Sequence, residues 1–274
     1  MTWKNVRAIA RLDLRRLFKS KDYWIPLTIL ATLFFVVIPL FALGTVENLA
    51  RTSFASQLTG IVGNLPESIT AAVPVESATA KAAYVIAVYM LAPIAIVVPL
   101  TISVAVASNA IVGERERGTG EFLAHSPITV REIYFGKLIA SLVPGYLATI
   151  VGFSLYALVV NLIVGPEMGG WFFPTSGWFF LILWVIPPFI AVAISIVLRM
   201  SARMRSAAAA QQASSLVTLP VIILSYAVAT RVIAAPGMSA FLIGGIAWVA
   251  AIILSVRGSG KLKRERLLGV ASET

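Results

Sequence analysis

The chain has no cysteine and a single histidine, His125, among its 274 residues. Without cysteine it forms neither disulfides nor thiolate metal sites, and one histidine excludes a multi-histidine metal centre. Charged residues are also scarce: they make up 12% of the chain, whereas soluble domains carry about 25%. Hydrophobic residues reach 59%, and the mean hydropathy is +0.91. This composition predicts an integral membrane protein.

Six long apolar runs account for the hydrophobic composition. A membrane-spanning helix needs about 20 residues, and each run is near or above that length with no charge in its middle. We therefore expect an all-α membrane protein with one transmembrane domain over residues 1–274. The expected spans are about 23–43, 82–112, 133–164, 177–198, 206–230 and 240–256, with an external loop at 44–81 and a cytosolic tail at 257–274.

The basic residues predict how the spans face the membrane. Of the 22 lysines and arginines, only Arg51, Lys81 and Arg231 fall in the loops after spans one and five. The others lie before span one, after spans two and four, and after span six. Cytosolic segments carry the excess of basic residues, so we expect both termini in the cytosol and the protein in the cell (cytoplasmic) membrane. This distribution explains the net charge of +10 without nucleic-acid binding.

Residues 3–19 predict an amphipathic helix before the first span. Apolar side chains recur at helical spacing, and basic side chains occupy the neighbouring stripe. Such a helix lies in the interface of an anionic cytosolic leaflet. The apolar stripe holds Trp3, Val6, Ala10, Leu14 and Leu17, and the basic stripe holds Lys4, Arg7, Arg11, Arg15 and Lys19.

A charged segment, residues 113–137, separates the second and third apolar runs. It holds four of the chain's 12 acidic residues, although the sequence on either side is apolar. Gly118 and Gly120 break the helix that ends span two, and Pro127 stops the short amphipathic piece that follows. The pattern predicts a turn, a short helix parallel to the membrane and a second turn.

The charges and apolar residues of this segment suit docking to a partner protein. Acidic and basic residues alternate, so ion pairs can set the register of a docked partner, while Phe122 and Leu123 can insert as anchors. A solvated loop that only keeps the two helices in place is the alternative. Thr129 and Glu132 have the spacing of a capping box, which predicts the start of span three.

The segment reads Glu114-x-Glu116-x-Gly118-Thr119, then Glu121-x-Leu123, Ser126-Pro127-Ile128, Glu132-Ile133 and Gly136-Lys137-Leu138. In this pattern it resembles the permeases of type-2 ATP-binding-cassette (ABC) exporters, which are membrane subunits with six helices. The resemblance implies that two permeases pair, here as a homodimer, and that each docks on a separate ATPase subunit through the loop between spans two and three. The coupling residues that it implies are Glu114, Glu116, Gly118, Thr119, Glu121, Phe122, Leu123 and Pro127, with residues 121–125 as the coupling helix. Gly120 departs from the pattern, because a larger residue is expected there.

ATP hydrolysis is expected in that partner and not in this chain. Residues 258–261 resemble the end of a phosphate-binding P-loop, but Ser255 and Leu262 stand where the motif needs glycine and then serine or threonine. We therefore expect no cofactor in this chain, with ATP and magnesium held by the ATPase. His125 has no evident carboxylate or nucleophile set around it, so we interpret it as a surface loop residue.

Polar residues within two spans are candidates for a transport path or a dimer axis. Polar groups in hydrocarbon need a partner or a water-filled cavity, and small residues nearby allow helices to approach closely. Hydrogen bonds between helices of one subunit are the alternative. The stripe in span five is Gln211, Ser215, Thr218 and Ser225, and a weaker stripe in span two includes Thr101 and Ser108.

We expect the membrane permease subunit of an ABC exporter that moves a hydrophobic or amphipathic cargo outward. Closure of the ATPases would push on the coupling helix, and span two, as one long helix, would carry the displacement into the bilayer. One alternative is an ABC-type relay that passes force to an extracytoplasmic partner without transporting a solute. Another is an ion-coupled secondary transporter, but such proteins usually place a charged residue within their spans.

Overall fold

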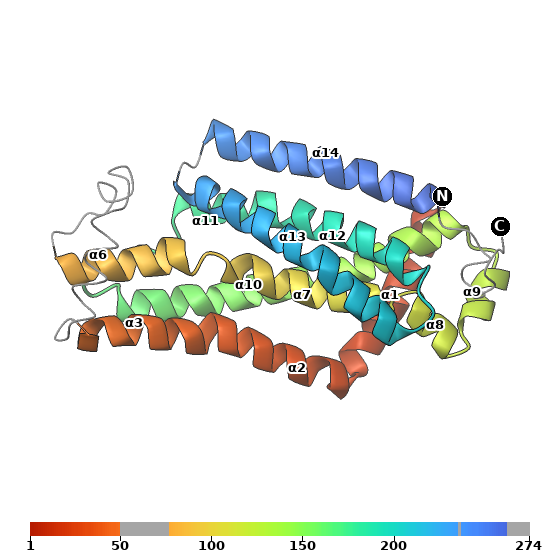
Figure 1. Cartoon of the computed structure of the whole chain (residues 1–274), viewed down its shortest axis with the longest axis horizontal. Coiled ribbons are helices and arrows are strands. Elements are labelled where there is room, and N and C mark those ends of the chain that lie inside the picture. Colours follow the sequence, from red (N-terminus) through yellow and green to blue (C-terminus); the bar gives the residue numbers. More distant parts are fainter. Residues whose placement is uncertain (50–76, 235–236, 262–274) are drawn as a thin grey trace.

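The computed structural model describes residues 1–49, 77–234 and 237–261, and within these ranges every regular element is helical. Six helical segments are long and apolar enough to cross a membrane. They run side by side along the long axis of the molecule, as Figure 1 shows. The predicted all-α membrane fold with six spans is confirmed.

Several of the spans are built from consecutive helical pieces, three of which (η1, η2 and η3) are π-helical. Span one comprises α2 (Lys21–Thr32), η1 (Leu33–Val37) and α3 (Ile38–Leu49), and span two comprises α6 (Ala78–Val85), η2 (Ile86–Met90) and α7 (Ile94–Asn109). Span three is α10 (Val130–Ile163), and span four comprises α11 (Ser176–Phe180), η3 (Leu181–Val185) and α12 (Ile186–Ser201). Spans five and six are α13 (Ala207–Ala234) and α14 (Met238–Lys261), and the helices outside the spans are α1 (Trp3–Lys19), α8 (Val112–Glu116) and α9 (Gly120–His125).

Two expected segments fall largely outside the described residues. They are residues 50–76 of the external loop and residues 262–274 of the tail. In the described part of the tail, α14 continues as a helix through Lys261. The segment 258–261 is therefore helical and does not form a phosphate-binding loop.

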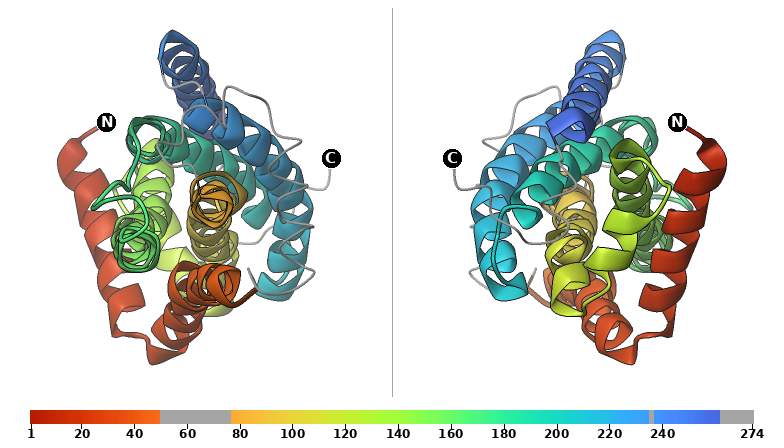
Figure 2. Two further views of the ribbon diagram at one scale, coloured as in Figure 1. Left: turned by 90° about the vertical axis from the view of Figure 1, so that its left-hand side faces the viewer. Right: turned by 90° about the vertical axis from the view of Figure 1, so that its right-hand side faces the viewer.

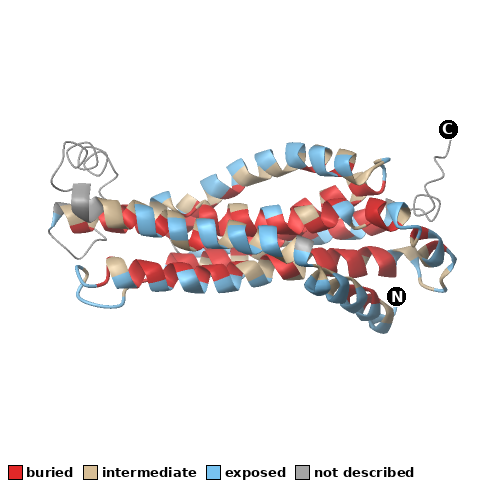
Figure 3. Ribbon diagram, turned by 90° about the horizontal axis from the view of Figure 1, so that it is seen from below, coloured by how far each residue is buried: buried red, intermediate tan, exposed pale blue. Residues whose placement is uncertain are grey.

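Spans two and four form the centre of the bundle. In their most apolar stretches 61% and 72% of residues are buried, against 17%, 28% and 22% in spans one, five and six. Figure 2, viewed along the spans, places α6 and α7 inside a ring of the other helices, and Figure 3 shows the alternation of buried and exposed faces. The three outer spans therefore present apolar side chains to lipid or to a second subunit.

Span two is interrupted in its N-terminal half, where one long helix was expected. Pro93 has no N–H to donate, and the chain turns there between η2 and α7. The break leaves the carbonyls of Ala87 and Val88 without the usual helical donors. Tyr156 donates its hydroxyl to the Ala87 carbonyl, and the Trp178 indole donates to the Val88 carbonyl at 3.0 Å. These two buried side chains let the backbone break persist within the membrane, where an unpaired carbonyl is costly.

Spans two and three approach closely at a glycine. A Cβ added at Gly145 of α10 would lie 2.6 Å from the carbonyl oxygen of Pro99 and 1.9 Å from Ser103 Oγ in α7. The serine side chain can rotate, but the Pro99 carbonyl belongs to the backbone and moves only with its helix. Small residues permit this kind of contact between membrane helices.

We predict that Gly145→Ala separates α7 from α10 and destabilises the protein by about 1–3 kcal/mol, the usual cost of overpacking. Gly245→Ala in α14 is the matched control, because an added Cβ there meets no atom within 4 Å. Thermal unfolding in detergent measures both. Equal melting temperatures for the two variants would show that the α7–α10 contact is looser than described.

Candidate functional site

α8 and α9 form a hairpin between spans two and three, at the end of the molecule where α1 lies (Figure 1). We call residues 112–129 the hairpin. Gly118 turns the chain between the two helices with a φ of 71°, a left-handed conformation that favours glycine. At the far side of the hairpin, Thr129 and Glu132 make both hydrogen bonds of the predicted capping box, which starts α10.

A buried ion cluster joins the hairpin to α10 and α1. Lys137 Nζ of α10 lies 2.8 Å from Glu114 Oε1 of α8 and 2.9 Å from Asp13 Oδ2 of α1. Glu114 and Lys137 are each only 3% exposed. Because an isolated buried charge is strongly unfavourable, each of these groups holds the others in place, and three elements that are distant in sequence meet at one ammonium group.

Three further groups surround the Glu114 carboxylate. Arg16 and Arg117 lie 3.3 and 3.4 Å from its Oε1, and the Thr119 hydroxyl donates to its Oε2. Burial of Glu114 raises its pKa, but Lys137, together with Thr119 and Arg117, outweighs burial and lowers the pKa from 4.5 to about 2. Glu114 is therefore ionised at neutral pH, and its negative charge is paired with basic groups of the same chain.

The start of α1 is attached to α10 by a second set of contacts. Glu132 accepts hydrogen bonds from the Thr2 backbone N–H at 2.5 Å, from the Thr2 hydroxyl at 2.8 Å and from Asn5 Nδ2 at 3.2 Å. One turn further along α10, Gly136 allows α1 to pack closely, since an added Cβ would lie 2.7 Å from Ile9. The helix predicted at residues 3–19 thus packs directly on span three.

The hairpin also contacts the turn that leads into span five. Glu116 Oε1 accepts a hydrogen bond from the backbone N–H of Ala207, the first residue of α13, at 2.7 Å. The first N–H groups of a helix have no partner within the helix, so this carboxylate caps α13. Arg115 donates to the Met204 carbonyl in the same turn. Two contacts therefore connect α8 to the start of span five.

Ser201, at the end of span four, bridges the bend between α7 and α8. Its hydroxyl oxygen lies 3.4 Å from the Ile111 N and 3.3 Å from the Val112 N, and it donates to the Ser108 carbonyl at 2.6 Å. Ser201 is fully buried. One side chain thus pairs three backbone groups that the bend would leave unsatisfied, so span two bends before the hairpin without losing its connection to span four.

α9 presents its outward face away from these contacts. The helix covers Gly120–His125, one residue more than the coupling helix expected from sequence. Gly120 and Ala124 are buried, while Glu121 is exposed and Phe122 is 81% exposed. Leu123 is half-buried, and the exposed Pro127 follows. Gly120, where the sequence departs from the expected pattern, thus lies on the inner face of α9.

The predicted polar stripe divides into two groups. The Ser108 hydroxyl lies 2.5 Å from Gln211 Oε1, so these two residues link spans two and five within one chain. The other side chains of the stripe bond to carbonyls of their own helices: Thr101, Ser215, Thr218 and Ser225. Of these four, Thr101 and Ser215 are exposed and Ser225 is buried.

In the described part of the chain, no cluster of three or more His, Cys, Asp or Glu side chains could hold a metal ion. Charged groups of the hairpin region such as Glu114, Glu116 and Lys137 are joined to one another or to a backbone N–H group. Such an arrangement positions helices relative to one another. The fold thus defines a membrane protein of six spans with a charged hairpin at one end.

A family model described as ABC-2 family transporter protein matches residues 7–257, which is most of the chain. The protein therefore belongs to the ABC-2 transporter permease family, as the pattern in residues 113–137 predicted. It is a multi-pass membrane subunit of an ABC transporter, and members of this family associate with ABC ATPase subunits and lack ATPase activity themselves. A comparison with curated proteins found no match.

We predict that Lys137→Met destabilises the protein by about 3 kcal/mol or more, because it removes the ammonium group that pairs with the buried Glu114 and the partly buried Asp13. Adding Glu114→Gln to this variant should recover part of the loss, since Asp13 is then the one carboxylate of this contact that has lost its lysine partner. Lys4→Met, at an exposed position of α1, is the control and should change little. Thermal unfolding of the wild type, Glu114→Gln alone and these three variants completes the comparison. Additive losses in the double variant would contradict the direct Glu114–Lys137 contact.

The lowered pKa of Glu114 predicts a specific dependence of stability on pH. A carboxylate whose pKa is lower in the folded state stabilises the protein above its unfolded pKa, and this contribution is lost as the pH falls toward the folded value. The difference in melting temperature between the wild type and Glu114→Gln should therefore be constant above about pH 4.5 and shrink as the pH approaches 2. A difference that is already lost near pH 6 would show that Glu114 is not paired in this way.

Proposed function

We propose that the protein is the permease subunit of an ABC exporter, which works as a homodimer with two ATPase subunits and moves a hydrophobic or amphipathic cargo outward. The observation that carries this proposal is the exposed face of α9, with Phe122 at its centre, at the end of a hairpin fixed to α1, α10 and α13. Membership of the ABC-2 family supports it, because such permeases work with ABC ATPases.

The ATPase docks on α9 in this proposal. Exposed aromatic residues that fill a partner's pocket commonly dominate the affinity of a protein interface. Phe122 is such a residue, and the exposed Glu121 beside it provides a charge that can set the register. Glu114 and Thr119, which the sequence pattern assigned to coupling, act behind this surface, because Glu114 is buried in the ion cluster and Thr119 donates to it.

Force from the ATPase then reaches the bilayer through contacts of α8. The Glu114–Lys137 pair carries it to span three, and the Glu116 cap carries it to span five. Span two follows through the bend that Ser201 bridges. The hairpin therefore moves spans two, three and five together. This concerted movement opens the cavity between the two subunits outward.

Span five faces the second subunit in the proposed dimer. Only 28% of its most apolar stretch is buried within the chain, and the exposed residues there include Ser215 beside the apolar Leu216 and Leu219. A polar hydroxyl and small residues on an otherwise apolar face favour contact with another helix over lipid. The absence of charge from the middle of the spans favours a cargo that is hydrophobic or amphipathic over bare ions.

Docking through α9 predicts that Phe122→Ala weakens binding of the ATPase subunit about 30-fold, since a central aromatic anchor contributes about 2 kcal/mol. The fold should be unaffected, because this side chain is 81% exposed. Trp171→Ala is the matched control: Trp171 is 68% exposed in the connection between α10 and α11 at the other end of the bundle. Titration of the partner ATPase into the purified permease measures the affinity. Unchanged binding by the Phe122 variant would remove α9 as the docking site.

The dimer placement predicts disulfide cross-linking of Ser215→Cys in a chain that has no other cysteine. Oxidation in membranes should yield a covalent dimer in at least one nucleotide state of the complex. Val249→Cys is the control, because Val249 is 57% exposed on α14 and is expected to face lipid. A dimer formed only by the Val249 variant would move the interface from span five to span six.

A further inference from the structure

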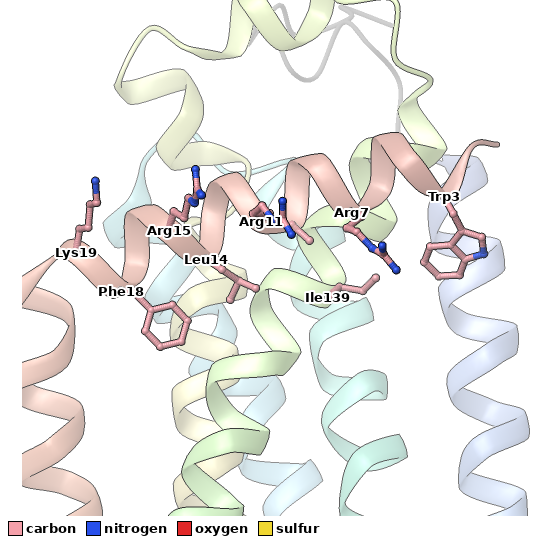
Figure 4. A pocket seen from close by; sticks show the side chains of 9 residues that line it. Trp3, Arg7, Arg11, Leu14, Arg15, Phe18, Lys19 and Ile139 are labelled. Atoms are coloured by element: carbon pink, nitrogen blue, oxygen red, sulfur yellow. The ribbon is translucent and has the colours of Figure 1, made fainter.

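A groove runs along α1 where this helix crosses span three. Its volume is about 550 Å³, and its wall is mostly apolar. Figure 4 shows the side chains of Trp3, Leu14 and Phe18 on the side of α1 that faces the spans, with Ile139 of α10 between them. The lining residue Ile139 belongs to α10, which continues from here as a candidate span, so the groove lies at the end of the membrane-spanning bundle.

One edge of the groove is basic. Arg7, Arg11 and Arg15 stand four residues apart, with Lys19 one turn further, and all four side chains are exposed. Residues four apart in a helix are about 6 Å apart along its axis, so the three guanidinium groups line one side of α1. The four ion pairs found among the described residues do not include these arginines or Lys19. Among the residues that the structure describes, no acidic side chain lines the groove.

The opposite side of α1 carries the contacts to the hairpin region. Asp13 and Arg16 join the buried ion cluster, and Thr2 and Asn5 bind Glu132. α1 thus lies between the groove and the charged groups that hold the hairpin. A ligand bound in the groove would press on the helix that positions the hairpin, without touching the hairpin itself.

We propose that this groove binds one anionic phospholipid, with the phosphate at the arginines and an acyl chain along Trp3, Leu14, Phe18 and Ile139. The combination of an apolar wall and a basic edge matches the two chemical parts of such a lipid. A soluble phosphate would leave the apolar wall uncovered, and a zwitterionic lipid would leave the excess basic charge unpaired. The bound lipid holds α1 against α10 and so stabilises the ion cluster; this role is additional to the proposed transport.

The test uses the intact permease in detergent, where no bilayer contributes, and counts bound molecules by native mass spectrometry. Phosphatidylglycerol, phosphatidylcholine and glycerol phosphate are added in turn. We expect one saturable phosphatidylglycerol and a higher melting temperature with it, but neither effect with the other two compounds. Equal binding of phosphatidylcholine would overturn the role of the arginines, and equal binding of glycerol phosphate would overturn the role of the apolar wall.

A variant with Arg7→Gln, Arg11→Gln and Arg15→Gln should bind phosphatidylglycerol roughly 100-fold more weakly, because each basic residue at a membrane surface contributes about fivefold. The control removes the same charge from other exposed arginines at the same end, through Arg131→Gln, Arg203→Gln and Arg205→Gln. An equal loss of phosphatidylglycerol affinity in the control would show that binding reflects general electrostatic attraction and not this site. If the variant does not fold, the comparison of the three added compounds on the wild type decides the proposal. A negative result leaves the proposed transport function intact, because these assays measure lipid binding without the ATPase and do not measure transport.

Discussion

Glu114 and Lys137 meet 2.8 Å apart with almost no exposure to solvent, and Asp13 completes the contact from the other side of the ammonium group. Removing these charges from water is costly, and only close pairing with further hydrogen bonds offsets the cost. Arg16, Arg117 and Thr119 supply those additional partners. The result is a cluster with few alternative arrangements, since any displacement of one member leaves another buried charge unpaired. The hairpin, α1 and span three are therefore constrained to move as one unit.

A rigid unit at this end of the bundle is useful only if it is connected to more than one span. The Glu116 cap on α13 and the Ser201 bridge at the bend of span two provide those connections. Each uses a backbone N–H or carbonyl as a partner, so the link depends on the position of a helix end and not on a flexible side-chain pair. Glu116 thus has a structural role inside the subunit in addition to any contact with an ATPase. A change at Glu116 alters the start of span five even before a partner binds.

The sequence was sufficient for the elements whose causes are local. Apolar runs gave the six spans, Thr129 and Glu132 gave the start of span three, and the glycines at 118 and 120 placed the turn before α9. The ion cluster was not foreseen, because Asp13 and Lys137 are separated by more than a hundred residues and each also suits a solvated surface. The residues of the pair could have been found only from the position of Lys137 at the base of a span, where a lone charge needs a partner.

The interruption of span two could not be predicted from the sequence for a different reason. Pro93 predicts a kink, but whether a membrane helix bends or breaks depends on donors that reach the freed carbonyls. Those donors, Tyr156 and Trp178, come from spans three and four, and both are almost fully buried. Similar reasoning applies to Gln211, whose partner Ser108 lies on another span. In each case a polar group of one span is satisfied by a group of another span, so the contact depends on how the spans pack and not on the pattern of any one span.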